Sequence, residues 1–169
     1  MFEATPFTGP LAELDKALNG QLTRLGESGD LNGKFAETLV IPDTPGIQPK
    51  RILIAGLGKA TQLSPARLEK SMMTAVRKIS EKENLNVAFL MPDVSATEMS
   101  AEDVACTSAT AMTVGAVGQG VYQSKSGRFP LNSTLLVDSA EVKNSLSASV
   151  SKGEILGESI NLTRDLVNR

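Results

Sequence analysis

Four short apolar runs, each long enough for one strand, alternate along this chain with longer segments of helical periodicity. The runs cover residues 37–42, 51–55, 86–92 and 133–139. In the second of them, residues 52–55 are apolar without interruption and bounded by turn residues, which is typical of a strand covered on both faces. The alternation predicts a three-layer α/β/α domain with a mixed, mostly parallel sheet.

The helical segments carry recognisable start signals. Ser64-Pro65 supplies an N-cap and a first-turn proline for a helix whose apolar face runs through 68–79. Ser100 and Asp103 have the spacing of a capping box, which predicts a helix start there. Nearer the N-terminus, Asn19-Gly20 interrupts a leucine-rich periodic segment and predicts two short helices in place of one.

The last segment, Lys152 to Arg169, has the pattern of an amphipathic helix that begins around 149–153. Ile155, Leu162 and Leu166 fall on one face, and we expect them to pack onto this domain. The opposite face is polar and holds Asn161, Arg164, Asp165 and Asn168. Either solvent or another domain could meet that polar face, and composition does not separate the two.

Size and charge restrict the function classes. A chain of 169 residues without a repeat or a low-complexity linker predicts one domain. The net charge of −2 and the lack of a basic stripe argue against a nucleic-acid partner. No apolar run is long enough for a membrane helix, and the N-terminus lacks a signal pattern. We therefore expect a cytoplasmic protein without a membrane partner.

The sequence contains no histidine and a single cysteine, Cys106. These counts remove Ser-His and Cys-His nucleophile pairs and the common zinc sites. Cys106 lies in a helical segment rich in small residues, where a buried thiol is the default interpretation. No loop gathers several carboxylates as a calcium or magnesium site does. The residues therefore assign no catalytic, cofactor-binding or metal-binding position.

Two glycine-containing segments are candidate phosphate loops. Gly56 and Gly58 follow the apolar run 51–55, but Thr61 stands where the dinucleotide fingerprint needs a third glycine. The second segment, Gly115 to Phe129, includes the Gly115–Gly120 run and then Tyr122, Lys125 and Arg128. Phosphate loops normally open a helix, and no helix clearly follows this one. For both segments a structural turn or connecting loop is the favoured interpretation.

Several stretches together resemble the leucyl aminopeptidase (cytosol aminopeptidase) family. They are RILIAGLGK at 51–59, SPARLEKSMMTAVRKI at 64–79, VYQSKS at 121–126 and NLTRDLVNR at 161–169. In the last of these, the positions that stand in the family's inter-domain pattern are Asn161, Arg164, Asp165, Leu166 and Asn168. The family usually has a proline soon after the final Asn, and here the sequence ends at Arg169.

This resemblance implies a non-catalytic, macro-domain-like N-terminal domain over residues 1–150. Residues 151–169 would then begin a linker helix toward a C-terminal catalytic domain, so we expect the chain to be truncated from a longer protein. In the truncated chain we expect Arg164, Asp165 and Asn168 to lack their partners. In the family, that second domain binds two divalent metals (zinc, manganese or magnesium) and releases N-terminal residues from peptides, and the enzymes are hexamers. None of its metal ligands or catalytic residues matches a position here, so we expect no cofactor in this fragment.

The hypothesis is therefore an architectural domain of a metalloaminopeptidase that contributes to subunit packing. An alternative is a macro-domain-like module that binds ADP-ribose or a nucleotide through the Gly56–Gly58 and Gly115–Gly120 loops. A DNA-contacting role, known in some bacterial relatives, is disfavoured by the charge balance.

Overall fold

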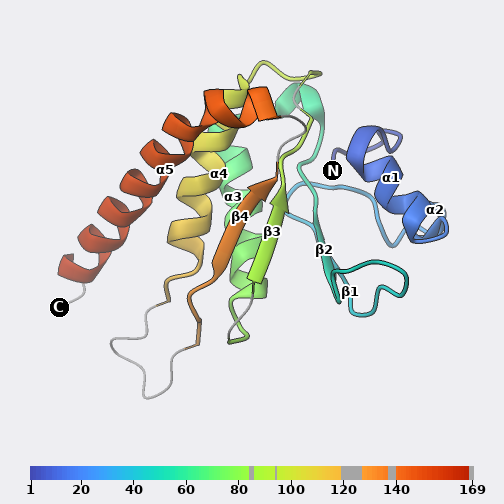
Figure 1. The fold of residues 1–169 in the computed structure, drawn as a ribbon, viewed down its shortest axis with the longest axis horizontal. Helices are drawn as coiled ribbons and strands as arrows, with labels where there is room; N and C mark the ends of the chain where they lie inside the picture. The colour runs from blue at the N-terminus through green and yellow to red at the C-terminus, as the bar shows by residue number, and fades with distance from the viewer. Residues whose placement is uncertain (84–85, 94, 119–126, 137–139, 168–169) are drawn as a thin grey trace.

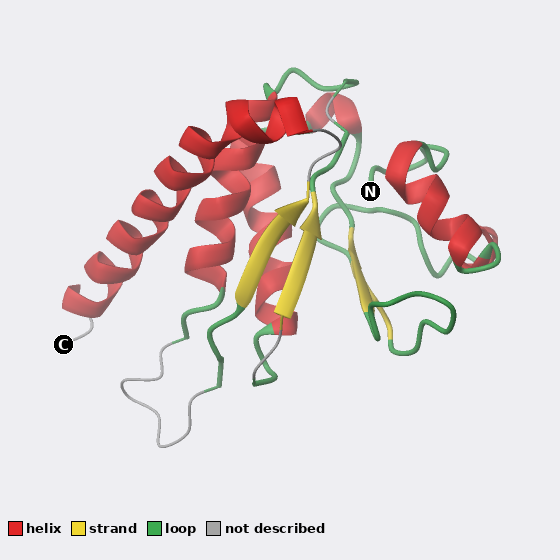
Figure 2. Ribbon diagram, viewed as in Figure 1, coloured by secondary structure: helices red, strands yellow, loops and turns green. Residues whose placement is uncertain are grey.

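The computed structural model describes residues 1–83, 86–93, 95–118, 127–136 and 140–167, with backbone alone for 133–136 and 140–143. Helices and strands follow one another along the chain (Figures 1 and 2). They are α1 (Gly9–Ala17), α2 (Gln21–Glu27), β1 (Thr38–Ile41), β2 (Ile52–Ala55), the 3-10 turn η1 (Ala60–Gln62), α3 (Pro65–Ile79), β3 (Asn86–Leu90), α4 (Ala101–Gly115), β4 (Asn132–Leu136) and α5 (Ala140–Val167).

The predicted helix starts are confirmed at α3 and α4. Ser64 Oγ accepts the backbone N–H of Arg67 at 3.4 Å, and Pro65 occupies the first turn of α3. Ser100 Oγ accepts from the Asp103 N–H at 3.1 Å and donates to the Asp103 carboxylate at 2.7 Å. These bonds satisfy N–H groups that a helix start leaves without an intrahelical partner.

The division between α1 and α2 falls at the predicted dipeptide. Asn19 and Gly20 both adopt positive φ, at 53° and 75°, a conformation that glycine and asparagine tolerate best. Gly20 cannot cap α2 through a side chain, so the cap comes from α1: Asp15 Oδ1 accepts the Leu22 N–H at 2.7 Å. The two short helices are thereby held together as one unit.

The strands form two pairs of opposite kind. β1 and β2 are antiparallel, with Thr38 opposite Ala55 and Ile41 opposite Ile52. β3 and β4 are parallel, with Asn86 opposite Asn132. The described residues therefore form a mixed α/β domain and do not show the mostly parallel sheet that we expected. The loop 42–51 explains the first pair, because a parallel crossover needs about a dozen residues or more.

The core is divided in the same way as the strands. One cluster gathers apolar residues of α3, α4 and β3 around Leu68, Val76 and Val104, and the other gathers α1, α2, β1 and β2 around Leu22 and Ile54. In Figure 1, α3, α4 and α5 stand together beside the β3–β4 pair, and α1 and α2 lie on the far side of β1–β2. Strand β2 is less covered than predicted, since Ile52 and Leu53 are only half-buried.

The last helix begins well before the predicted start at 149–153. It runs from Ala140 to Val167 without a break and packs along α4 more extensively than any other two elements of the described chain do. The sequence position 150, where we expected the domain to give way to a linker, lies inside this helix.

Candidate functional site

The Gly56–Gly58 turn has no backbone N–H group left for a phosphate. The N–H of Gly56 donates to Glu37 O at 2.8 Å, that of Leu57 to Met1 O at 2.9 Å, and that of Gly58 to Gly33 O at 2.9 Å. A phosphate cradle requires such groups to point at the ligand. This turn uses them to hold two other segments of the chain.

The local structure explains why both positions of this turn are glycine. A Cβ on Gly56 would lie 2.0 Å from Lys34 O, so the strand end can approach the 33–37 loop only without a side chain. Gly58 has φ +75°, where glycine is favoured. Beside it, the Arg67 guanidinium stacks on the Phe35 ring at 4.1 Å from the ring centroid. We did not predict this contact, because nothing in the sequence links residues 35 and 67.

The second candidate loop lies largely outside the described residues, which include neither Gly120, Tyr122 nor Lys125. Its described ends have structural roles. Gly115 faces α3, where an added Cβ would lie 2.9 Å from the Val76 side chain. Arg128 donates through Nη1 to the carbonyl oxygen of Arg77 at 3.0 Å. The basic side chain is thus engaged with the end of α3.

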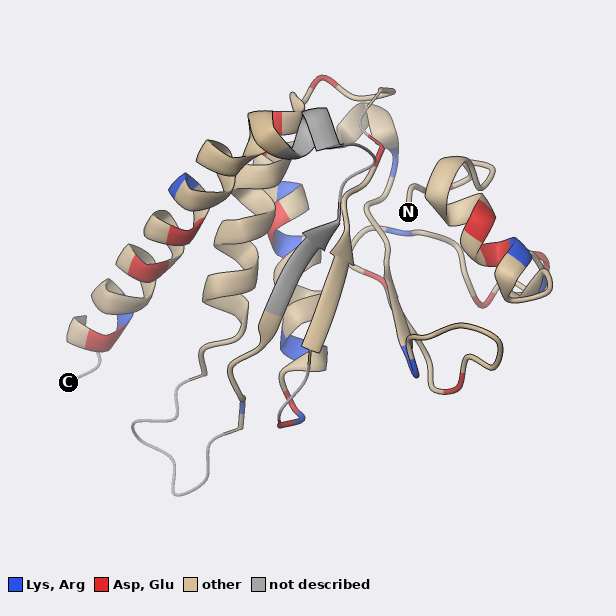
Figure 3. Cartoon of the chain, viewed as in Figure 1, with Lys and Arg blue, Asp and Glu red and all other residues tan. Residues whose placement is uncertain are grey.

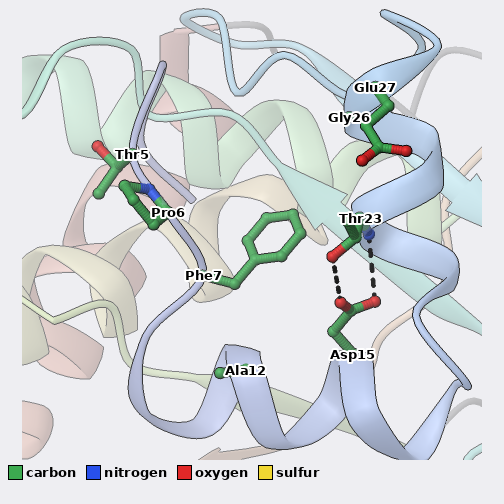
Figure 4. Close-up of a pocket in the computed structure, with 8 residues that line it drawn as sticks. All are labelled: Thr5, Pro6, Phe7, Ala12, Asp15, Thr23, Gly26 and Glu27. Carbon is green, nitrogen blue, oxygen red and sulfur yellow. Dashed lines mark hydrogen bonds between the residues drawn. The ribbon is translucent and has the colours of Figure 1, made fainter.

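An open pocket of about 510 Å³ lies between the N-terminal segment and the α1–α2 unit (Figure 4). Its acidic lining residues are Asp15 and Glu27. Asp15 accepts the N–H of Leu22 and both the N–H and the hydroxyl of Thr23. Burial alone would raise the pKa of this carboxyl, but the bonds from Thr23 and Leu22 outweigh it and hold the pKa below its usual value. Both carboxylate oxygens are occupied, so Asp15 serves as a helix cap and has no catalytic geometry.

The described residues also offer no donor set for a metal. No three Asp, Glu or Cys side chains in the described ranges lie close enough together to hold one ion. Cys106 is half-buried on α4, where its carbonyl accepts the Thr110 hydroxyl at 3.0 Å. Neither finding gives the described residues a metal site or an activated thiol.

Glycines form the contact between α4 and α5. A Cβ on Gly153 would lie 2.2 Å from Cys106 O, and one on Gly157 would lie 2.6 Å from the Thr113 Cβ. The Thr110 hydroxyl reaches the carbonyl of Gly153 at 3.0 Å. Since glycines four residues apart share one face of a helix, α5 approaches α4 along a stripe that has no side chains.

The polar face of α5 continues this stripe toward the C-terminus. Asn161 Nδ2 donates to Thr113 O at 3.1 Å, and Arg164 Nη1 donates to Asn161 Oδ1 at 3.4 Å. Asp165 is half-buried and also has an interaction partner, whereas Asn168 lies outside the described residues. The expectation that Arg164 and Asp165 would lack partners is therefore wrong, which weakens the inference of truncation drawn from them.

The apolar face of α5 consequently points outward. Ile155 is 64% exposed, Leu162 60% and Leu166 62%, so the prediction that they pack onto this domain is also wrong. Leu156, Ile160 and Val167 are exposed as well. A contiguous apolar surface of this kind commonly marks an interaction site. We refer to Ile155, Leu162 and Leu166 as the outer stripe of α5.

Charged residues do not gather into a broad surface of one sign on the described chain. Figure 3 shows Lys and Arg interspersed with Asp and Glu on α3 and α5, and Lys78 pairs with Glu81 at 3.7 Å. Among the described residues, no helix is long and apolar enough to span a bilayer.

The features of the described chain thus define a mixed α/β domain in which the glycines of the Gly56–Gly58 turn and of α5 serve packing and helix α5 exposes an apolar face. Comparison with solved structures gives the same fold. A tomato leucine aminopeptidase mutant matches with a TM-score of 0.72 and 24% identity, over 96% of this chain and 32% of that one. The bottromycin maturation enzyme BotP in complex with Mn matches with a TM-score of 0.68 and 18% identity, over 100% of this chain and 30% of that one.

Comparison of sequences identifies the family. Residues 1–126 match the N-terminal domain of the cytosol aminopeptidase family, and the chain belongs to that family. A probable cytosol aminopeptidase of Ralstonia nicotianae is 27% identical over 180 aligned positions, covering 99% of this chain and 34% of the relative. A probable cytosol aminopeptidase of Methylobacillus flagellatus is 32% identical over 94 aligned positions, which cover 56% of this chain and 19% of the relative. The chain spans about a third or less of the length of these relatives.

Proposed function

We propose that this chain is the non-catalytic, architectural domain of a leucyl aminopeptidase-type metalloenzyme. Hydrolysis with two divalent ions, manganese or zinc, would take place in a C-terminal catalytic region, as the relatives' greater length and names suggest. The domain would hold that region in place and contribute to packing in a hexamer. A cytoplasmic location fits the relatives' description as cytosol aminopeptidases.

The exposed outer stripe of α5 carries this proposal. Three large aliphatic side chains, each more than half exposed, lie at steps of seven and four residues on one helix face. Covering a Leu or Ile side chain gains about 1.5–3 kcal/mol, so three of them can contribute substantially to a domain interface. In this arrangement residues 1–150 form the α/β unit. Residues 151–169 begin the connection, which makes the second half of α5 both a packed element and a docking surface.

Association with a catalytic region tests this function. The chain is mixed with the C-terminal region of the Ralstonia nicotianae relative, and binding is followed by sedimentation and by manganese-dependent release of leucine from a chromogenic amide. We expect a complex with the unchanged chain and at least about tenfold weaker binding for Leu162→Glu/Leu166→Glu, since buried charge is strongly disfavoured.

Val117→Glu is the matched control, because Val117 is exposed but lies beyond the end of α4 and outside the stripe. It should bind like the unchanged chain. Equal binding by the stripe variant and the control would show that another surface joins the two regions. Absence of any complex would contradict the architectural role itself.

The alternative of a nucleotide-binding module gains no support from the Gly56–Gly58 turn, whose N–H groups are all donated within the chain. Calorimetric titration with millimolar ADP-ribose is expected to give no heat of binding. Saturable heat would restore that alternative.

A further inference from the structure

Two cations of α3 lie over one aromatic ring on the surface of the domain. The Arg67 guanidinium carbon is 4.1 Å from the centroid of the Phe35 ring, and the Lys70 Nζ is 5.6 Å from it. Arg67 is half-buried and Lys70 is exposed. Residues three apart on a helix are neighbours on its surface, so the two charges lie together although like charges repel. We refer to Phe35, Arg67 and Lys70 as the Phe35 cluster.

The backbone around the cluster is shaped to admit the guanidinium. An added Cβ on Gly58 would lie 3.0 Å from Arg67 Nη2, closer than ordinary van der Waals contact, so a side chain there would displace the guanidinium. Ala36, next to Phe35, has a φ of 60°, which residues with a Cβ seldom adopt. Such strain persists where the surrounding structure enforces it, and it is commonest at binding and active sites.

The described chain leaves the hydrogen-bonding groups of Arg67 unused. Its Nε is enclosed and has no partner among the described residues, and a buried donor without a partner costs free energy. Its Nη groups donate no hydrogen bond to a described residue either, but they are not enclosed. Stacking on Phe35 therefore fixes the plane of the guanidinium, and the Nη end is the part that a ligand can reach.

No ion pair neutralises the cluster in the part of the chain that the structure describes. The one ion pair there joins Lys78 to Glu81, near the end of α3. The first turn of α3 holds Arg67 and no acidic residue, so the helix dipole adds to the positive potential. None of the acids that lie nearest, in sequence or through a backbone bond to Gly58, pairs with either cation: Glu69, Glu37 and Glu3.

We propose that the Phe35 cluster binds a carboxylate group. The two Nη groups of Arg67 donate to its two oxygens as a fork, the arrangement in which a guanidinium binds a carboxylate most specifically, and Lys70 adds a second positive charge. A phosphate fits less well, because it is normally cradled by backbone N–H groups and those of the adjacent Gly56–Gly58 turn are all donated within the chain. The site lies on a different helix from the outer stripe of α5 and does not depend on the proposed function.

Two sources supply a carboxylate, a small polycarboxylate anion and an acidic peptide segment. The chain is titrated with citrate and, separately, with a capped glutamate tripeptide, and inorganic phosphate is the comparison. The NMR signals of the Arg67 Nε–H and the Gly58 amide are followed at constant ionic strength, because salt screens open charged sites. We expect saturable shifts at millimolar concentration with at least one carboxylate probe, and weaker binding of phosphate.

The outcomes of the titration separate the two sources. Saturation with citrate alone identifies a small anion as the ligand, and saturation with the peptide alone identifies an acidic segment. Saturation with both shows that the carboxylate group itself suffices. No saturable shift with either probe would overturn the proposal. Phosphate binding as tight as that of the carboxylate probes would overturn it as well, because the fork would then not select the ligand.

Variants on α3 assign the binding to the cluster. Arg67→Gln should bind at least about tenfold more weakly, because it loses the charged hydrogen bonds. Arg67→Lys keeps the charge without the fork, and its affinity should lie between those of the unchanged chain and Arg67→Gln. Lys70→Gln, at an exposed position, should weaken binding about threefold. Arg77→Gln is the matched control, since Arg77 is an exposed arginine of the same helix, and it should bind like the unchanged chain.

The Tm of each variant shows whether it folds. If Arg67→Gln fails to fold, Lys70→Gln decides, and unchanged binding by that variant would overturn the proposal. Equal weakening by Arg67→Gln and Arg77→Gln would overturn it too, because the probes would then follow the net charge of the chain and not the cluster.

Discussion

Helices α3 and α5 each carry an apolar stripe along one face and use it in opposite ways. In α3 the side chains of Leu68 and Val76 are fully buried and Met72 is 8% exposed. In α5 the outer stripe has similar spacing, yet each of its residues is at least 60% exposed. Helical periodicity therefore establishes that a stripe exists, and the neighbouring elements decide whether the stripe faces the core.

The glycine stripe of α5 accounts for the difference. Gly153 and Gly157 let the helix approach α4 at backbone distance, and Thr110 and Asn161 add hydrogen bonds across that contact. Dispersion contacts between closely packed helices can replace aliphatic burial, because each atom pair gains most near its optimal separation. The aliphatic side chains of the outer stripe therefore stay exposed, and they are available to pack against another surface.

The largest expected difference in the free energy of unfolding is between Leu→Ala substitutions on the two helices. Leu68→Ala should lower the free energy of unfolding by about 2–5 kcal/mol, because it leaves a cavity in the core. Leu162→Ala should change it by less than about 0.5 kcal/mol, as expected of an exposed site. Urea denaturation followed by circular dichroism measures both. A loss of comparable size at the two sites would mean that the outer stripe is buried within the isolated chain.

A second prediction concerns the glycine stripe. Gly153→Ala should lower the free energy of unfolding by about 1–3 kcal/mol, the usual cost of overpacking, because the new Cβ meets Cys106 O and the Ala109 Cβ. The sign of this change in the free energy of unfolding distinguishes a packed site from an open one, since alanine in an open helix position is favoured over glycine by about 1 kcal/mol.

Ser151→Ala, at an exposed position of the same helix, is the control and should be neutral within about 0.5 kcal/mol. If Gly153→Ala instead stabilised the chain, α5 would not lie against α4 as described.

The third prediction tests the polar contact at the end of the stripe. Asn161→Ala removes the bond to Thr113 O and should lower the free energy of unfolding by about 1 kcal/mol. Thr163→Ala is the matched control, because the Thr163 side chain is exposed and its hydroxyl donates to Ser159 O one turn back in the same helix. Thermal denaturation of both variants gives the comparison. Equal Tm values would show that Asn161 contributes nothing to the docking of α5.

Local signals in the sequence predicted local structure well. Ser64-Pro65, Ser100 and Asn19-Gly20 act through bonds and φ values within a few residues, so their consequences could be predicted without the rest of the chain. The antiparallel pairing of β1 and β2 could also have been predicted, because the loop 42–51 is too short for a crossover.

Contacts between distant segments could not be predicted in the same way. The direction of the outer stripe depends on the surface of α4, more than forty residues away, as the bond from Asn161 to Thr113 shows. The four-residue spacing of Gly153 and Gly157 was the available signal for close helix packing. The absence of a phosphate site at Gly56–Gly58 depends on Met1, Gly33 and Glu37, which only the fold brings to the turn.

The smallest expected effect on stability comes from a polar substitution in the outer stripe of α5. Leu166→Ser should leave the free energy of unfolding within about 0.5 kcal/mol of the unchanged chain, because its side chain loses little burial. It should nevertheless weaken the fluorescence of a dye that binds exposed apolar surface, whereas Met72→Leu in α3 should not. An unchanged dye signal would mean that the outer stripe is not the apolar surface accessible to the dye. Another face of the domain would then have to dock onto the catalytic region.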